Sequence, residues 1–313
     1  MTARRYRIGL VGVGKIARDQ HLPAIAADPR FELVATASRH ADVDGVPAHH
    51  DIQAMLAAGH ALDAVSICTP PSGREAIARA AIDAGLAVML EKPPAATLSG
   101  IVQLAAHAAA AGTPLFATWH SREAAGVAAA RDWLSTRRVR AARISWKEDI
   151  RRWHPGQEWI LAAGGFGVFD PGINALSIAT AILPAPLAVE SARIVVPAGR
   201  AAPIAADLRL RAGEATVEAA FDFLQTGPQT WDIEVDTDDG PLLLRDGGRT
   251  LVIGGRAAAA AADEEYPRLY RRFAQLLDAR ASDVDLAPLR LVADAFLVAE
   301  RVTGEAFAFD ASG

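Results

Sequence analysis

Hydrophobic and polar positions follow two different patterns along the chain, and the change falls near residue 122. Before it, short runs that are apolar along their whole length are separated by segments with the apolar spacing of an amphipathic helix. The apolar runs predict buried strands at residues 6–12, 31–38, 62–70, 86–93 and 114–120. The segments between them predict helices at residues 15–27, 51–59, 72–85 and 97–112. Because strands that are apolar throughout need cover on both faces, this region predicts a doubly wound parallel sheet.

After that point the apolar residues recur at every second position, and Gly or Asp-Gly turns separate the runs. This pattern predicts strands at residues 139–149, 187–197, 206–212, 215–225, 230–240, 241–248 and 250–255. Helical spacing returns at 170–183 and in a closing helix at 286–302. The fold class is therefore α/β. We expect a Rossmann domain over residues 1–122 and an α+β domain with a large open, mostly antiparallel sheet over residues 123–313.

Composition narrows the possible partners and compartments. The 313 residues carry a net charge of −5, and no run of Lys or Arg suggests a nucleic-acid or membrane partner. The single cysteine, Cys68, cannot form an internal disulfide, and no signal peptide or long apolar span is evident, so we expect a cytoplasmic protein. The alanine-rich stretches at 104–111 and 257–262 are expected to form a helix and a compact loop.

The turn after the first predicted strand has the pattern G-x-G-x-x-A. Gly12 allows a tight turn, Gly14 lets the backbone approach a pyrophosphate, and Ala17 lets helix and strand pack closely. This pattern alone is weakly specific, but it lies between a strand and a helix, which is the required context. We therefore expect a bound dinucleotide at this turn, with Lys15 and Ile16 among its contacts.

The end of the second predicted strand indicates which dinucleotide is bound. An NAD site usually places a carboxylate there for the ribose 2′-hydroxyl, whereas this chain has Ser38 and Arg39. A hydroxyl and a guanidinium can hold a 2′-phosphate. NADP is therefore the expected cofactor, with NAD possible. The alternative is that Arg39 is simply a solvated surface residue.

Lys92 is one of only three lysines in the chain and directly follows a predicted strand. Ligands of doubly wound sheets bind outside the carboxyl ends of the strands, where this lysine lies. Pro93 and Pro94 restrict the backbone after it. We interpret Lys92 as a functional residue, although a strand-end lysine that only points into water is the alternative.

The segments "GVGKIA", "CTPP" and "EKP" occur in the order and spacing typical of the glucose–fructose oxidoreductase/inositol dehydrogenase (Gfo/Idh/MocA) family, which this chain resembles. The similarity continues through "FATWHSR", "WKEDIRRWHPGQEWI" and "GVFDPGINALSI", which look like those of bacterial sugar 1-dehydrogenases of the family. The resemblance implies a second domain built on an open sheet. It also implies cofactor contacts from Thr69, Pro70, Glu91 and Lys92.

Residues 146–159 gather aromatic and polar groups around a Pro-Gly turn. Trp153 beside His154 suits a sugar, because an aromatic face packs on C–H groups while imidazole and the Glu148 carboxylate bond hydroxyls. Trp231 is expected to close this pocket from a strand, and Trp159 is the member expected to be purely structural. The alternative is a loop pinned by tryptophans, with solvated charges.

Asp170 and Asn174 lie four residues apart, on one face of the predicted helix. Asp170 could instead be an N-cap. Many relatives carry a histidine where this chain has Asn174, and asparagine cannot take up a proton. Asp170 is therefore the preferred general base, and Lys92 is the alternative. His120, at the predicted domain junction, is also expected to contact substrate.

Together these features predict oxidation of an aldopyranose such as L-arabinose, D-galactose or D-fucose at C1, giving the aldonolactone while hydride passes to nicotinamide. No spacing of His, Cys and carboxylates indicates a metal site. An exposed open sheet would suit a homodimer. Two alternatives stay open: an oxidoreductase that acts on another sugar or inositol position, and a dinucleotide-dependent sugar-binding regulator without catalytic activity.

Overall fold

The structure is a computed structural model that describes residues 4–260 and 264–309. The chain divides into two compact units. The first contains the residues up to His120 together with Glu265–Asp285, and the second contains Ser121–Glu264 and the residues from Leu286 onward. The observed division therefore lies next to the predicted boundary at residue 122. The segment 265–285, which the sequence pattern placed in the second domain, packs with the first unit instead.

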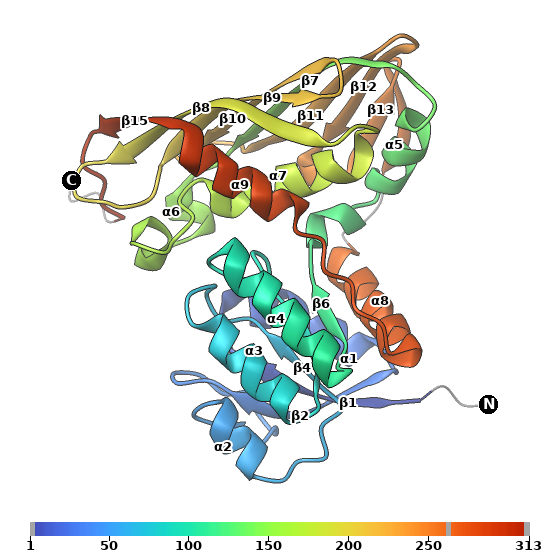
Figure 1. Cartoon of the computed structure of the whole chain (residues 1–313), viewed down its shortest axis with the longest axis vertical. Helices are drawn as coiled ribbons and strands as arrows, with labels where there is room; N and C mark the ends of the chain where they lie inside the picture. Colours follow the sequence, from blue (N-terminus) through green and yellow to red (C-terminus); the bar gives the residue numbers. More distant parts are fainter. Residues whose placement is uncertain (1–3, 261–263, 310–313) are drawn as a thin grey trace. The chain divides into compact units, whose positions relative to one another are not determined.

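The first unit is built on one parallel sheet (Figure 1). Its six strands have the order β3-β2-β1-β4-β5-β6. This strand order is that of the Rossmann fold. Its elements are β1 (Tyr6–Val11), a π-helical turn η1 (Ala17–His21), α1 (Leu22–Ala27), β2 (Phe31–Ala37), β3 (Ala48–His49), α2 (Ile52–Ala57), β4 (Ala64–Ile67), α3 (Arg74–Asp83), β5 (Ala87–Leu90), α4 (Leu98–Ala111), β6 (Leu115–Ala117) and α8 (Glu265–Ala279).

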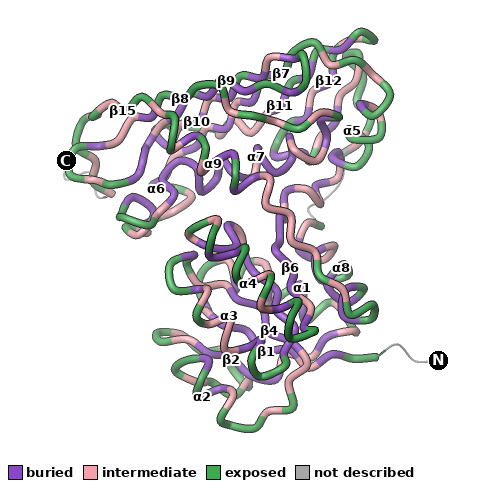
Figure 2. Tube along the Cα trace, viewed as in Figure 1, coloured by how far each residue is buried: buried purple, intermediate pink, exposed green. Residues whose placement is uncertain are grey.

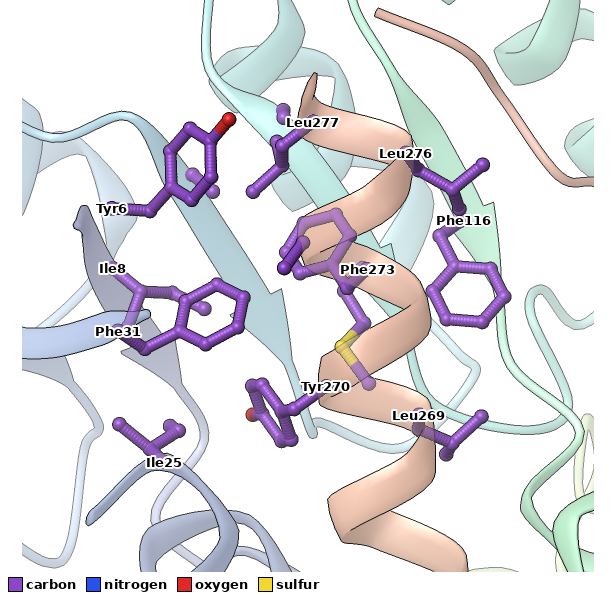
Figure 3. Close-up of a cluster of buried hydrophobic side chains, with 14 of the residues drawn as sticks. Tyr6, Ile8, Ile25, Phe31, Phe116, Leu269, Tyr270, Phe273, Leu276 and Leu277 are labelled. Carbon is purple, nitrogen blue, oxygen red and sulfur yellow. The ribbon is translucent and has the colours of Figure 1, made fainter. Parts of the chain in front are cut away.

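The helix α8 returns from late in the sequence to complete the cover of this sheet. The helices α2, α3 and α4 pack in series, whereas α1 packs with α8. Tyr266, Tyr270 and Phe273 of α8 belong to the same buried core as Met89 and Phe116. Figure 3 shows Tyr270 and Phe273 projecting from α8 toward Phe31 and Phe116. The cover on both faces that the apolar strands require is therefore supplied from a segment about 150 residues farther along the chain.

The second unit is built on a nine-stranded sheet in the order β14-β13-β12-β11-β7-β10-β9-β8-β15. The pairs β7–β10 and β8–β15 are parallel and the others are antiparallel. Its elements are η2 (His120–Glu123), which begins at the last residue of the first unit, α5 (Val127–Leu134), β7 (Val139–Lys147), α6 (Ile150–Trp153), η3 (Glu158–Leu161), α7 (Phe169–Ile182), β8 (Leu187–Pro197), β9 (Ala205–Ala212), β10 (Ala215–Asp222), β11 (Thr230–Thr237), β12 (Gly240–Arg245), η4 (Asp246–Gly248), β13 (Thr250–Ile253), β14 (Arg256–Ala260), α9 (Ala287–Val298) and β15 (Ala299–Gly304).

The helix α7 lies on one face of this sheet and is buried along most of its length (Figure 2). Pro171 is tolerated because it falls in the first turn, where its missing N–H has no intrahelical partner. Gly172 allows close packing, since a Cβ there would come within 3.2 Å of the Phe221 ring. The strands alternate buried and exposed residues, so the opposite face of the sheet is open.

Two local predictions were wrong, and one helix was missed. Residues 257–260 form the edge strand β14 and not a loop, because Gly254 and Gly255, both at positive φ, close a two-residue hairpin after β13; residues 261–263 lie outside the described part. The closing helix ends at Val298, and the residues after it pair with β8 as β15. The helix α8 was not expected at all. Within the described residues, no helix is both long and apolar enough to cross a membrane.

Candidate active site

The glycine turn between β1 and η1 has the form that a dinucleotide requires. Gly12 has a φ of +89°, and a Cβ there would lie 2.9 Å from the backbone nitrogen of Thr69 and 3.1 Å from the carbonyl carbon of Cys68. Only glycine combines this backbone conformation with so close an approach. At Gly14 a Cβ would meet nothing within 4 Å, so the space beside the second glycine is open.

Thr69, at the end of β4, carries a buried hydroxyl beside this turn. Among the residues that the structure describes, its Oγ1 has no hydrogen-bond partner. Leaving a buried polar group unpaired costs about 1–3 kcal/mol, and a bound polar molecule would offset this. The open turn and the unpaired hydroxyl both fit a dinucleotide pyrophosphate at the carboxyl ends of β1 and β4.

The remaining predicted contacts near this turn differ in how accessible they are. Lys15 is exposed and pairs with Asp19 one helical turn later. Pro70 is exposed beside Thr69, whereas Ile16 is partly buried against the core of the first unit. Lys15 and Pro70 are therefore accessible to a ligand, while Ile16 also contributes to packing.

Ser38 and Arg39 line a shallow pocket of about 330 Å³ after β2. The backbone nitrogen of Ser38 donates to the carbonyl of His49 over 2.9 Å, which brings the end of β3 to the pocket. The imidazoles of His40 and His49 therefore join the guanidinium, together with one carboxylate, Asp42. His49 was missed because the strand that carries it, β3, is only two residues long and gives no sequence signal. Arg39 supplies the positive charge of this pocket, and Asp42 supplies its carboxylate.

Glu91 lies inside the first unit, where its carboxylate accepts three hydrogen bonds. Tyr266 Oη donates to Oε1 over 2.6 Å, and His21 Nε2 lies 3.1 Å from the same oxygen. The backbone nitrogen of Lys92 donates to Oε2 over 2.8 Å. Only 3 % of Glu91 is exposed. The Glu91 carboxylate therefore contacts the protein interior. Of the two predicted cofactor contacts Glu91 and Lys92, only Lys92 is partly accessible to a ligand, because it is half-buried.

The charges and hydrogen bonds within this buried network offset the effect of burial on the pKa values of Glu91 and His21. Burial alone would raise the pKa of Glu91, but hydrogen bonds and charge from His21, with help from His120 and Tyr266, hold it well below its usual range. Burial alone would lower the pKa of His21, but the acidic groups around it, Cys68, Tyr270 and Glu91, raise it well above its usual value. Burial and the Glu91 charge raise the pKa of Tyr266, so it stays a donor.

Arg74, the first residue of α3, is buried and binds the backbone at the ends of two strands. Its Nε donates to the carbonyl of Thr69 over 3.0 Å, and its Nη1 donates to the carbonyls of Glu91 and Pro93. The Lys92–Pro93 peptide between these carbonyls is cis. Arg74 therefore ties the ends of β4 and β5 together. Its role gave no sequence signal, because an arginine at a helix start is normally solvated.

In the second unit, Glu148 joins residues that are distant in the sequence. Its Oε2 accepts from Trp231 Nε1 over 2.9 Å, and its Oε1 lies 3.1 Å from His154 Nε2. The other ring nitrogen, Nδ1 of His154, lies 4.0 Å from Asp170 Oδ2. Glu148 is 2 % and Asp170 4 % exposed, so the structure brings together four predicted residues in one largely buried polar cluster.

Aromatic rings line this polar cluster. Trp231 stacks on Trp146 and packs against Trp153, with ring centroids 5.8 and 4.8 Å apart. His154 lies edge-on to Phe223 at 5.5 Å. Trp146 was not among the predicted residues, but it is the residue directly opposite Trp231 in the β7–β11 pairing. The predicted combination of aromatic faces and polar groups is therefore present.

Asp170 is not the N-cap of α7. The cap position is Val168, and Asp170 lies inside the first turn, one turn before the partly exposed Asn174. Trp159 is half-buried in the short helix η3 and makes none of the cluster's hydrogen bonds given above. Trp231 lies in β11 and Asp170 in α7, whereas Glu148 directly follows β7 and His154 directly follows α6. They meet because α7 packs on β7 and β11.

His120 lies in the first unit, where α8 fixes its ring. Its Nδ1 is 2.5 Å from Glu265 Oε2, and it stacks on Tyr266 at 5.4 Å between centroids. The structure therefore groups His120 with Glu265, Tyr266 and the Glu91 network. Within the described residues, no three His, Cys, Asp or Glu side chains are grouped to hold a metal ion.

Comparisons with known proteins agree with this architecture. Residues 6–118 match the family model Gfo/Idh/MocA, described as an oxidoreductase family with an NAD-binding Rossmann fold. Galactose 1-dehydrogenase from Pseudomonas fluorescens is 46 % identical over 304 residues, which cover 96 % of this chain and 98 % of that protein.

Solved structures extend the comparison to the whole fold. The crystal structure of D-galactose-1-dehydrogenase from Rhizobium etli has a TM-score of 0.94 and 51 % identity, covering 98 % of this chain and 99 % of that one. A 3-ketoreductase from Actinomadura kijaniata, in complex with NADP and TDP-benzene, has a TM-score of 0.81 at 20 % identity, covering 96 % of this chain and 100 % of that one. The latter likeness concerns the fold alone.

Proposed function

This chain belongs to the Gfo/Idh/MocA oxidoreductase family, and on that premise we propose that it is an NAD(P)-dependent aldose 1-dehydrogenase. The proposal includes D-galactose, L-arabinose and D-fucose as substrates and the aldonolactone as product. Galactose is the sugar named for the two relatives at 46 % and 51 % identity. Residues 123–313 are proposed to bind the sugar and residues 1–122 the dinucleotide.

The observation that carries the proposal is the buried cluster of Glu148, His154, Asp170 and Trp231. Oxidation at C1 removes a hydride from the carbon and a proton from its hydroxyl group, so it requires a proton acceptor as well as a hydride acceptor. Asp170 can take the proton, while a tryptophan face and fixed polar groups suit the C–H and O–H faces of a pyranose. The relatives' names and this cluster support the same reaction class.

The bound dinucleotide would supply the hydride acceptor, its nicotinamide C4. The chain's own residues would hold it: the Gly12–Gly14 turn and Thr69 at the pyrophosphate, and Ser38 with Arg39 at the adenosine ribose. We propose NADP as the preferred form, because Arg39 and the nearby histidines favour a 2′-phosphate and the strand end lacks the carboxylate of an NAD site.

Asp170 is proposed as the base that takes the C1 hydroxyl proton, and Lys92 as the group that stabilises negative charge developing on that oxygen. Lys92 is also the alternative base. Asn174 would bind a ring hydroxyl without proton transfer, because an amide cannot accept a proton at neutral pH. His154 and Glu148 would bind further hydroxyls, with Trp153 and Trp231 against the ring. His120 remains a proposed substrate contact.

A substrate series tests this function. We expect D-galactose, L-arabinose and D-fucose to be oxidised well, because they share the ring hydroxyl arrangement and differ only at C5. D-Glucose and D-talose invert one hydroxyl each, and a buried partner left unpaired costs about 1–3 kcal/mol, or roughly 5- to 150-fold in kcat/KM.

The measurement is kcat/KM for the five sugars, from the absorbance of the reduced cofactor. Equal kcat/KM values for D-glucose and D-galactose would refute the proposed recognition of the ring hydroxyls. No turnover with any sugar would refute the enzyme and favour a binding protein. A cytoplasmic location and a homodimer formed through the open sheet are also proposed; size-exclusion chromatography with light scattering tests the dimer.

A further inference from the structure

We propose that Glu91 is a positioning residue for Lys92, and that Tyr266 on α8 and His21 hold its carboxylate in place; the inference rests on the role proposed for Lys92. The family resemblance implied that Glu91 is a cofactor contact. The structure instead surrounds its carboxylate with donors from the protein. The segment after β5 is thereby connected to a helix that lies about 175 residues later in the chain.

The burial of the network argues for a fixed geometry. His21, Glu91 and Tyr266 are each at most 3 % exposed, so solvent does not compete for their hydrogen bonds. Glu91 cannot rotate without breaking at least two of its three contacts at once. A buried, ionised carboxylate is retained only when its partners are all in place. The position of the carboxylate is therefore set by β5, η1 and α8 together.

The contact from the Lys92 backbone transmits this geometry to the lysine. The Lys92 N–H donates to Glu91 Oε2 over 2.8 Å, while Arg74 binds the carbonyls of Glu91 and Pro93 on either side. The backbone at Lys92 is thus held on both sides, and this fixes the direction in which its side chain leaves the strand end. An ammonium group must be held to within a fraction of an ångström to stabilise charge at a reacting oxygen.

The helix α8 also holds His120 by two contacts, through Glu265 and through the face of Tyr266. Removing the Tyr266 hydroxyl leaves this stacking intact and removes only the donor to Glu91. Tyr266→Phe is therefore the primary variant. Glu91→Gln is the second variant. It keeps the size of the side chain but removes the charge, and it tests the same hydrogen bond by changing the acceptor.

Tyr6→Phe is the matched control. Tyr6 is buried in the same core, and its hydroxyl donates to the carboxylate of Asp278 on α8 over 2.7 Å. The control therefore loses one tyrosine–carboxylate hydrogen bond between α8 and the rest of the first unit, as Tyr266→Phe does. It does not touch Glu91, Lys92 or His21.

The first readout is the chemical reactivity of the lysines, which needs no turnover. The chain has only Lys15, Lys92 and Lys147, so acetylation by acetic anhydride followed by peptide mass spectrometry gives a rate for each. We expect Tyr266→Phe and Glu91→Gln to raise the Lys92 rate by about fivefold, the ratio for one lost hydrogen bond. Lys15 and Lys147 should keep their rates, and Tyr6→Phe should leave all three unchanged.

The second readout is the split between kcat and KM with D-galactose and NADP. Tyr266→Phe should lower kcat by about tenfold with little change in either KM, because binding residues are untouched. An unchanged Lys92 acetylation rate in both Tyr266→Phe and Glu91→Gln would overturn the inference, and so would equal effects in Tyr6→Phe. Acetylation does not depend on catalysis. If the protein oxidised no sugar, the proposed function would be refuted, but the acetylation rates would still test whether Glu91 positions Lys92.

Discussion

Asp170 and Lys92 are the two side chains proposed to handle the proton of the sugar hydroxyl, and their settings differ. Asp170 is 4 % exposed in the first turn of α7 and lies 4.0 Å from a nitrogen of His154, whereas Lys92 is half-buried at a strand end. We expect Asp170→Asn to lower kcat by about 10²–10⁴-fold with a small change in KM, the scale of lost general base catalysis. Steady-state kinetics of Asp170→Asn and Lys92→Ala, compared with the wild type, measures both changes. A change in KM alone for Asp170→Asn, with turnover abolished in Lys92→Ala, would make Lys92 the base.

Arg39 governs cofactor choice in the same proposal. It lines the pocket after β2 with Ser38, and the structure adds His49 to that pocket. Arg39→Ala should weaken NADP by about ten- to a hundredfold and NAD little, because one charge-assisted hydrogen bond contributes roughly 1.5–3 kcal/mol. Dissociation constants from fluorescence titration of both cofactors measure the effect. If NADP and NAD were weakened equally, Arg39 would not be a 2′-phosphate ligand.

At the scale of elements, the buried contacts of Glu91 and His21 between β5, η1 and α8 should make the free energy of unfolding depend on pH. The pKa of His21 is raised, so its contribution to stability is complete below its unfolded value of about 6.5 and is lost as pH rises through the higher folded value. The pKa of Glu91 is lowered, so its contribution is complete above about 4.3 and is lost only in stronger acid. Both contributions are therefore complete between about pH 4.3 and 6.5.

We therefore expect the free-energy difference between wild type and His21→Gln to be largest in that window and to shrink as pH rises above it. Urea unfolding from pH 5 to pH 9, followed by intrinsic fluorescence, gives both curves. A difference that stays constant with pH would mean that His21 does not carry a proton in the folded state.

The elements also show what the sequence could and could not predict. Strand and helix positions in the first unit agree with the apolar patterns, and the glycine turn lies where the motif places it. The helix α8 was missed although Tyr266, Tyr270 and Phe273 have helical spacing, because its role depends on a sheet more than 140 residues earlier. The Glu91 network was missed for the same reason, since its donors come from η1 and α8.

For the whole molecule, sequence patterns predicted both sheets and named the residues of the second-unit cluster, but not their mutual contacts. Glu148, His154 and Trp231 were expected to line one pocket, and Asp170 was a separate candidate. The β7–β11 pairing and the packing of α7 bring the four together. The chemistry of single residues identifies candidates for a site. The strand pairing and helix packing that bring some of them together leave no signal in the local sequence.

The central claim is that the chain removes hydride from C1 of an aldose, and isotope transfer tests it most directly. D-Galactose carrying deuterium at C1 should give reduced cofactor with one deuterium at nicotinamide C4, detected by mass spectrometry and proton NMR. D-Galactose deuterated at C2, C3 or C4 should give unlabelled cofactor. Reduced cofactor that forms from the C1-deuterated sugar without deuterium, or that takes its label from another ring carbon, would contradict the account.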